Sequence, residues 1–307
     1  MSQAPDCMVK TFVAFLFLSC VALAWASHDC PGRTSGQTHR VEIPTPPDSL
    51  DGTARIAWMA GHYWDSVDLR DTLWLTDTAS LEQSFATWSW MLQHVPARDA
   101  SRMVSGFVSG LAEDRGMLYK VMSMAESYYD DPNSPYRAEE LWISALEAFL
   151  AVPGLPQERI IRPEWQLKSA MKNRPGTTAA DISGYLPNGE RAGLSDFRGK
   201  TVILLFYEPG CPECARTERY IRQSPVLGPA IITGRIRVLA VYPGDDRGLW
   251  EEHLPEFPSS WTVVMSPDVY SRLDYVVRAT PTLYLIDRSG TVLLKDVSAE
   301  TLEAYLR

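Results

Sequence analysis

The sequence predicts an all-α domain followed by a mixed α/β domain, and three observations lead to this fold class. The chain has 307 residues, about twice the length of an ordinary single domain. Between residues 48 and 173, apolar residues recur at steps of three and four, as on amphipathic helices. From residue 176 to 307, continuous apolar runs alternate with helical segments, which is typical of a mixed sheet flanked by helices. The intervening Arg174-Pro175-Gly176-Thr177-Thr178 breaks both patterns and is the expected domain boundary.

The composition excludes several classes of protein. With 45% hydrophobic and 22% charged residues, the chain has enough apolar side chains to fold, and its 19 Gly and 22 Pro lack a collagen period. The 29 Lys and Arg against 38 Asp and Glu give a net charge of −9 without a basic run, so we expect no nucleic-acid partner. Five cysteines are too few to form a disulfide scaffold for a chain of this length, so their positions indicate what they do.

The N-terminus has the features of a secretory signal. Lys10 precedes the apolar run Thr11–Ala24, which is shorter than the ~20 residues that cross a bilayer comfortably. Ala24-Trp25-Ala26 is a small-x-small cleavage signal. We therefore expect a signal peptide over residues 1–26, export to the periplasm, and no transmembrane span after cleavage. The alternative is lipid attachment at Cys20, because Phe17-Leu18-Ser19-Cys20 is a loose lipobox.

Residues 27–47 are rich in Gly, Pro, Ser and Thr and are expected to form a flexible tether, in which Cys30 is a bystander thiol. The helical domain follows over residues 48–173. Ser80 is the expected cap of its first clear helix, two more helices fall within residues 98–129, and Ser134-Pro135 opens another that stops at Pro153-Gly154. A last helix is expected over residues 163–172.

Seven of the ten tryptophans lie in this helical domain. Large aromatic side chains at helical spacing usually pack inward, so a tryptophan-rich core is the favoured interpretation. The alternative is a tryptophan-lined groove for a peptide or glycan. His62 and His94 have no neighbouring catalytic partner in the sequence and are expected to be structural.

The second domain, residues 176–307, alternates strand and helix patterns. Asn188-Gly189 favours a tight turn within a hairpin over residues 185–190. Apolar, β-branched runs predict buried strands over Thr201–Tyr207 and Ile236–Tyr242. The other predicted elements are helices over residues 211–222, 249–254, 266–277 and 299–306, and a terminal hairpin with strands over 281–287 and 291–295.

The motif Cys211-Pro212-Glu213-Cys214 lies where a buried strand ends and a helix begins. Pro212 suits the first helical position and pushes Cys211 toward the extended geometry of an N-cap. The unpaired N–H groups and the positive dipole end of the helix would then favour the Cys211 thiolate. Cys214, almost one turn later, can reach Cys211 but points deeper. One activated sulfur and one resolving sulfur are what thiol–disulfide exchange requires.

Structural zinc sites use the same cysteine spacing but need four ligands. No second Cys or His pair exists, and His253 has no nearby partner in the sequence, so we expect no metal and no cofactor. A second motif supports redox chemistry: Thr280-Pro281 begins a predicted strand. Proline cannot donate a backbone hydrogen bond to a neighbouring strand, and the peptide bond before a proline can be cis at little cost in free energy.

Three motifs together resemble the thioredoxin superfamily over residues 176–307: Gly199-Lys200-Thr201, the two-cysteine motif, and Ala279-Thr280-Pro281-Thr282-Leu283-Tyr284. With its Leu194–Lys200 lead-in, the domain is most similar to exported thiol–disulfide oxidoreductases. The helical half resembles a domain of unknown function attached to such domains in Bacteroidetes-type bacteria. The resemblance implies that Cys211 attacks, that Cys214 resolves, that Pro281 is a cis-proline, and that the Thr280 backbone pairs with the substrate chain.

The chain departs from the family pattern in two places. Gly210 stands where the family often has tryptophan before the first cysteine, and Leu205 replaces the buried acid that thioredoxin carries on the preceding strand. Proton transfer for Cys214 must then use another group, and the candidates are Glu208, Glu213 and Glu218.

These features predict an exported thiol–disulfide oxidoreductase whose partners are disulfide-containing proteins or a membrane redox partner. A peroxiredoxin is disfavoured because its Pro and Thr positions hold Leu204 and Glu208 here. The alternative from another class is a cell-envelope binding protein whose helical domain captures a ligand beside a structural or regulatory thioredoxin-like domain.

Overall fold

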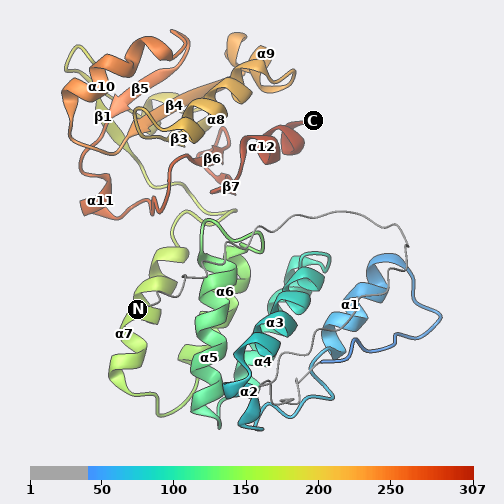
Figure 1. Ribbon diagram of the computed structural model, residues 1–307. Helices are drawn as coiled ribbons and strands as arrows, with labels where there is room; N and C mark the ends of the chain where they lie inside the picture. Colours follow the sequence, from blue (N-terminus) through green and yellow to red (C-terminus); the bar gives the residue numbers. More distant parts are fainter. Residues whose placement is uncertain (1–40) are drawn as a thin grey trace, which may run out of the picture. The chain divides into compact units, whose positions relative to one another are not determined.

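The computed structural model describes residues 41–307 and begins with a helical part. Its helices are α1 (Gly52–His62), α2 (Leu73–Thr76), α3 (Thr78–Leu92), α4 (Ala97–Gly110), α5 (Arg115–Ala125), α6 (Glu139–Leu150) and α7 (Gln157–Ala170), with a π-helical turn at Glu126–Asp130. Figure 1 shows α3, α4, α5 and α6 running alongside one another. The signal peptide predicted over residues 1–26, Cys20 and Cys30 lie outside the described residues.

Tryptophans fill the core of the helical part. Trp88 and Trp142 are almost fully buried, and the Trp88 indole N–H donates to the Ala60 carbonyl at 2.9 Å. Trp90 and Trp165 are instead half exposed. At the described end of the tether predicted over residues 27–47, Val41 and Pro46 are buried, and Val41 packs into this same core.

Three predicted helix starts are wrong. Asp77, not Ser80, caps α3, and its carboxylate accepts the Ser80 backbone N–H at 3.2 Å. Residues 134–138 form turns rather than helix because the Ser134 hydroxyl donates to the Tyr128 carbonyl at 2.6 Å, so α6 begins at Glu139. The last helix begins at Gln157 and includes Pro163, because the preceding Pro156 already has the extended geometry of an N-cap.

The α/β part is built on one seven-stranded sheet. The strands are β1 (Ser183–Tyr185), β2 (Arg191–Gly193), β3 (Thr201–Phe206), β4 (Ile236–Tyr242), β5 (Thr262–Met265), β6 (Thr282–Ile286) and β7 (Val292–Lys295), in the order β2-β1-β5-β4-β3-β6-β7. The pairs β3–β4 and β4–β5 are parallel, and the others are antiparallel. The predicted mixed sheet is thus confirmed.

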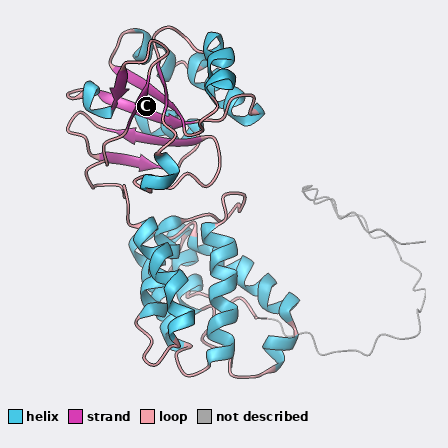
Figure 2. Cartoon of the chain, turned by 90° about the vertical axis from the view of Figure 1, so that its left-hand side faces the viewer, coloured by secondary structure: helices cyan, strands magenta, loops and turns pink. Residues whose placement is uncertain are grey.

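Helices cover both faces of this sheet (Figure 2). They are α8 (Pro212–Gln223), α9 (Leu227–Ile232), α10 (Arg247–His253), α11 (Val269–Arg272) and α12 (Ala299–Leu306), with 3-10 turns at Leu194–Phe197 and Leu254–Glu256. Alternate residues of the inner strand β3 face the two sides of the sheet: Ile203 and Leu205 pack with α8, α9 and α12, whereas Leu204 and Phe206 pack with α11 and the first 3-10 turn. This two-sided burial explains the continuous apolar runs.

One predicted helix, over residues 266–277, is wrong. Only the four residues of α11 are helical, and Leu273 ends it with a left-handed φ of 54°. The Ser266 hydroxyl donates to the Ser183 carbonyl at 2.8 Å, and the buried Tyr275 hydroxyl donates to the Ala180 carbonyl at 2.6 Å. These tertiary bonds hold the segment in a loop. Strand β5 and helix α9 are elements that the sequence patterns did not indicate.

Residues 41–307 belong to one compact unit, and three ion pairs join its helical and α/β parts. They are Asp130 with Arg278, Arg137 with Asp296, and Glu139 with Lys295. The domain limits expected at residues 173 and 176 stay a prediction. Within residues 41–307, no helix is both long and apolar enough to cross a lipid bilayer.

Candidate active site

Cys211 is the N-cap of α8, in the turn that follows β3. Its backbone is extended, with φ −75° and ψ 118°, and Pro212 occupies the first helical position. The Cys214 backbone N–H donates to the Cys211 sulfur at 3.2 Å. Gly210, just before it, has a φ of 72°, a conformation that glycine adopts without steric cost. The sulfur therefore lies among the unpaired N–H groups at a helix start, where negative charge is favoured.

The segment before β6 places its backbone beside this sulfur. The Thr280–Pro281 peptide bond is cis, and the Thr280 carbonyl lies 3.8 Å from the Cys211 sulfur, within reach of the thiol proton. The Thr282 hydroxyl donates to the Ala279 carbonyl at 2.6 Å and so fixes the turn. Residues 69 positions apart in the chain thus meet at one point.

The two cysteines, both free thiols, differ in exposure. Cys211 is half-buried, whereas the Cys214 side chain is buried, with 6% of its surface exposed. Burial raises the pKa of Cys214 to about 12, and its interaction with the Cys211 sulfur adds to the rise. The inner sulfur therefore holds its proton at neutral pH until a group removes it.

A hollow of about 210 Å³ opens beside the two cysteines. Glu208 and Glu218 line it, whereas Glu213 lies on the other side of the first turn of α8, where it pairs with Arg216. Burial raises the pKa of the Glu208 and Glu218 carboxyls, and an ion pair with Arg222 at 3.1 Å opposes the rise at Glu218. Glu218, which is 8% exposed, follows Cys214 by four residues, so the two side chains share one face of the helix.

His253 also lines this hollow, and the sequence reasoning missed it. Its Nδ1 lies 2.9 Å from the Leu249 carbonyl, which can only accept, so Nδ1 carries the proton and Nε2 is left free in the neutral ring. A Cβ added to Gly210 would lie 3.8 Å from that Nε2. The imidazole therefore lies over the residue that precedes Cys211. No spacing signal could show this, because α10 contacts the loop only in the folded chain.

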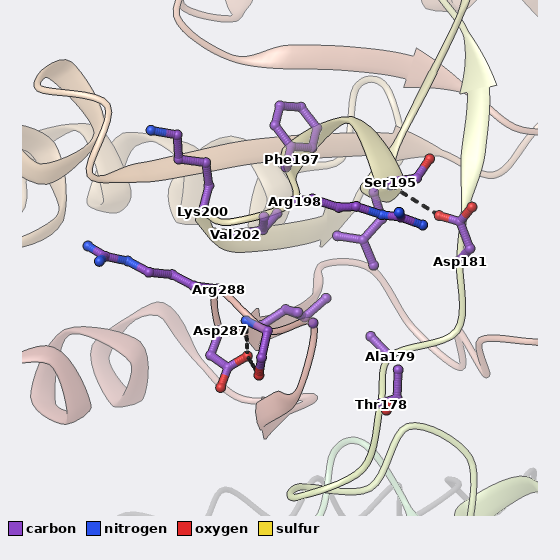
Figure 3. A pocket seen from close by; sticks show the side chains of 14 residues that line it. Thr178, Ala179, Asp181, Ser195, Phe197, Arg198, Lys200, Val202, Asp287 and Arg288 are labelled. Atoms are coloured by element: carbon purple, nitrogen blue, oxygen red, sulfur yellow. Dashed lines mark hydrogen bonds between the residues drawn. The ribbon is translucent and has the colours of Figure 1, made fainter.

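A larger hollow, of about 420 Å³, lies at the opposite end of the sheet, where β3 begins (Figure 3). Its lining includes Arg198, Lys200 and Arg288 but neither described cysteine. Figure 3 shows Lys200 and Arg288 extending to one side and Arg198 toward Asp181, so the three cations do not converge on one point. This hollow is not the site of thiol chemistry.

Among residues 41–307, no group of three or more His, Cys, Asp or Glu side chains is placed to hold a metal ion. The expectation that the protein uses no metal or cofactor stays a prediction.

Two protein families match this chain. Residues 195–307 match the thioredoxin-like domain, and residues 23–173 match a domain of unknown function, DUF5106. A thioredoxin-like protein from Bacteroides caccae ATCC 43185 has a similar crystal structure: the TM-score is 0.82 at 31% identity, over 86% of this chain and 97% of that chain. The chain therefore belongs to the thioredoxin-like proteins and carries DUF5106 as its N-terminal part. The predicted family and fold class are confirmed.

Two curated relatives specify the class further. The chain is 29% identical to the thiol-disulfide oxidoreductase ResA of Geobacillus kaustophilus over 134 residues, which are 43% of this chain and 75% of the relative. It is 30% identical to ResA of Geobacillus thermodenitrificans over 117 residues, 38% of this chain and 66% of the relative. The α/β part is thus similar to thiol–disulfide oxidoreductases.

Proposed function

We propose that the protein is an exported thiol–disulfide oxidoreductase that reduces or exchanges disulfides in other proteins through Cys211 and Cys214. One observation carries this proposal: a half-exposed sulfur caps a helix beside the Thr280 backbone, and a buried thiol lies one turn behind it. A purely structural domain has no physical need for this combination.

In the first step the Cys211 thiolate attacks one sulfur of a substrate disulfide. A bond forms between the two sulfurs, the substrate S–S bond breaks, and the other substrate sulfur leaves as a thiolate. The product is a mixed disulfide on Cys211. The Thr280–Pro281 edge lies beside this sulfur and is the part of the fold that can position the substrate chain.

In the second step Cys214 gives up its proton and attacks the Cys211 sulfur. The mixed disulfide breaks, the substrate leaves with its second thiolate, and a Cys211–Cys214 disulfide forms, so two electrons pass to the substrate. We assign the proton to Glu218, because its buried carboxylate lines the same hollow one helical turn away. Glu213 points to another side, where it pairs with Arg216. A membrane redox partner then supplies two electrons, which reduce the Cys211–Cys214 disulfide and restore the dithiol.

The proposal is tested by reduction of insulin by the chain lacking residues 1–26, with dithiothreitol as the electron source. Cys211→Ser is expected to abolish catalysis, whereas Cys30→Ser, the matched control, leaves it unchanged. Activity that survives Cys211→Ser would overturn the assignment. A wild-type chain that reduces no disulfide would favour the non-catalytic binding protein instead. Export, with cleavage after Ala26 rather than lipid attachment at Cys20, is checked by the amino-terminal sequence of the secreted chain.

A further inference from the structure

A groove of about 470 Å³ extends from the Thr280–Pro281 edge, on the side away from His253. The α/β part lines it with Thr280 and Pro281, with the first turns of α8, and with residues 296–300 before and within α12. The helical part lines it with Pro132 and Arg137. Both come from residues 131–138, the segment between the π-helical turn and α6, which we call the 131–138 loop.

Internal contacts hold the 131–138 loop in one shape. The Ser134 hydroxyl donates to the Tyr128 carbonyl at 2.6 Å, and the Gln93 amide donates to the Pro135 carbonyl at 2.8 Å. The Tyr128 and Tyr136 rings stack with centroids 5.3 Å apart. A surface ordered in this way binds without the entropic cost of immobilising a mobile loop.

Ion pairs hold this loop against the groove. Arg137 pairs with Asp296, and each side chain is less than a quarter exposed. At the end of the π-helical turn, Asp130 pairs with Arg278, which also donates to the Asp130 carbonyl at 3.1 Å. Arg278 is two residues before Thr280, so the same contact anchors the segment that places its backbone beside Cys211.

We propose that the 131–138 loop is the outer wall of the substrate groove, so that the helical part contacts the polypeptide that flanks the target disulfide. This inference rests on the proposed function and names the part of the helical region that contacts its substrate. A small disulfide needs only the Cys211 sulfur and the adjacent edge. An extended polypeptide advances about 3.3 Å per residue, so residues flanking its cysteine pass Pro281 and reach Pro132.

The charges of the groove indicate what kind of segment it accepts. Its lining includes two basic and three acidic side chains of mixed arrangement: Arg137, Arg216, Glu213, Asp296 and Glu300. Such a lining favours a polar segment with hydrogen-bonding groups over an apolar one, because an apolar segment would remove water from these charged groups without offering them hydrogen bonds. Pro132 is exposed at the rim, so its replacement changes the groove without removing a buried contact.

The test compares two substrates on the chain lacking residues 1–26. Pro132→Trp is expected to raise KM for insulin about tenfold, equivalent to roughly 1.4 kcal/mol, while the rate constant for oxidised glutathione stays within about twofold. Pro135→Trp is the matched control, since Pro135 is exposed in the same loop but does not line the groove. The denaturation midpoint of each variant verifies that it is folded.

A charge-swap pair keeps the test decisive if the bulky variant disturbs the loop. Pro132→Glu is expected to favour a disulfide peptide whose cysteine is flanked by lysines. Pro132→Lys is expected to favour a disulfide peptide whose cysteine is flanked by glutamates. Both preferences should become smaller in high salt, because salt screens the charges. Equal effects on both substrates, or no effect of any Pro132 variant, would overturn the inference. A wild-type chain that reduces neither insulin nor glutathione would instead refute the proposed function.

Discussion

At the scale of single residues, two cysteines of one motif have different chemistry because of their positions on one helix. Cys211 caps α8 and accepts the Cys214 N–H, so its sulfur lies at the positive end of the helix. Cys214 lies within the first turn, where burial raises its pKa to about 12. The order of attack in the proposed reaction follows from this difference, because only a thiolate is nucleophilic.

The proton on Cys214 gives Glu218 a testable role. Glu218→Gln is expected to slow the release of the mixed disulfide about 100-fold without changing the first attack, as for loss of a general base. Because burial raises the pKa of Glu218, the wild-type release rate should increase with pH through a range above the ordinary carboxyl value. In Glu218→Gln this step in the pH profile should vanish. Rapid acid quenching followed by mass spectrometry of the mixed disulfide measures the rate.

Glu213→Gln is the matched control for this experiment. Glu213 is in the preceding turn of α8, is largely exposed and is paired with Arg216, so its replacement should leave the release rate nearly unchanged. Equal slowing by both variants would show that the effect comes from the net charge of the helix, and it would remove Glu218 from its role.

The sequence indicated the two cysteines and Thr280-Pro281, because their geometry depends on local rules for helix starts and strand edges. It did not decide which of the three glutamates accepts the Cys214 proton. That choice depends on burial, and burial depends on the whole fold. Glu218 alone is both buried and within the hollow. His253 was dismissed because only tertiary packing brings α10 over Gly210.

At the scale of elements, the short helix α10 carries both a core residue and a site residue. Trp250 is fully buried, and His253 lines the hollow beside the cysteines. The Asp246 carboxylate accepts the Leu249 backbone N–H at 2.9 Å and so caps the helix. A helix of seven residues is marginal without a cap and tertiary packing.

Asp246→Ala is therefore expected to lower the free energy of unfolding by about 1 kcal/mol, the usual loss for an N-cap. Asp245→Ala removes the same charge from the neighbouring exposed position, which does not cap the helix, and should leave stability almost unchanged. Urea denaturation of the two variants measures the difference. Equal losses would mean that charge, rather than the cap, accounts for the effect.

Helices and strands were predicted correctly where their burial produces a clear pattern of apolar residues in the sequence. Strands β3 and β4 were predicted because burial on both faces makes them continuously apolar. Strand β5 has only four residues, too short for a pattern of its own. The sequence predicted a longer helix over residues 266–277, but the tertiary hydrogen bonds of Ser266 and Tyr275 determined the loop.

At the scale of the whole molecule, the contacts between the helical and α/β parts could not be read from the sequence. Asp130 and Arg278 are separated by 148 positions, and Arg137 and Asp296 by 159. Lys295 is 6% exposed and donates to the Ala170 and Lys172 carbonyls at 2.8 and 2.7 Å, in addition to pairing with Glu139. These bonds satisfy a buried ammonium group, although burial lowers the pKa of Lys295 and raises that of Glu139.

These contacts end at the segment that borders the cysteines, and they support our proposal that the helical part lines the substrate groove. The central claim nevertheless depends on a single bond, the one that forms between Cys211 and a substrate sulfur. All other assignments in the mechanism presuppose it.

The most direct measurement is therefore to trap that bond. Cys214→Ala, incubated with oxidised insulin as the disulfide substrate, should form a covalent adduct that mass spectrometry locates on Cys211 and that a reductant releases. Wild type should accumulate no such adduct, because Cys214 resolves it. Absence of an adduct on Cys214→Ala, or an adduct that persists when Cys211 is also replaced by serine, would contradict the account.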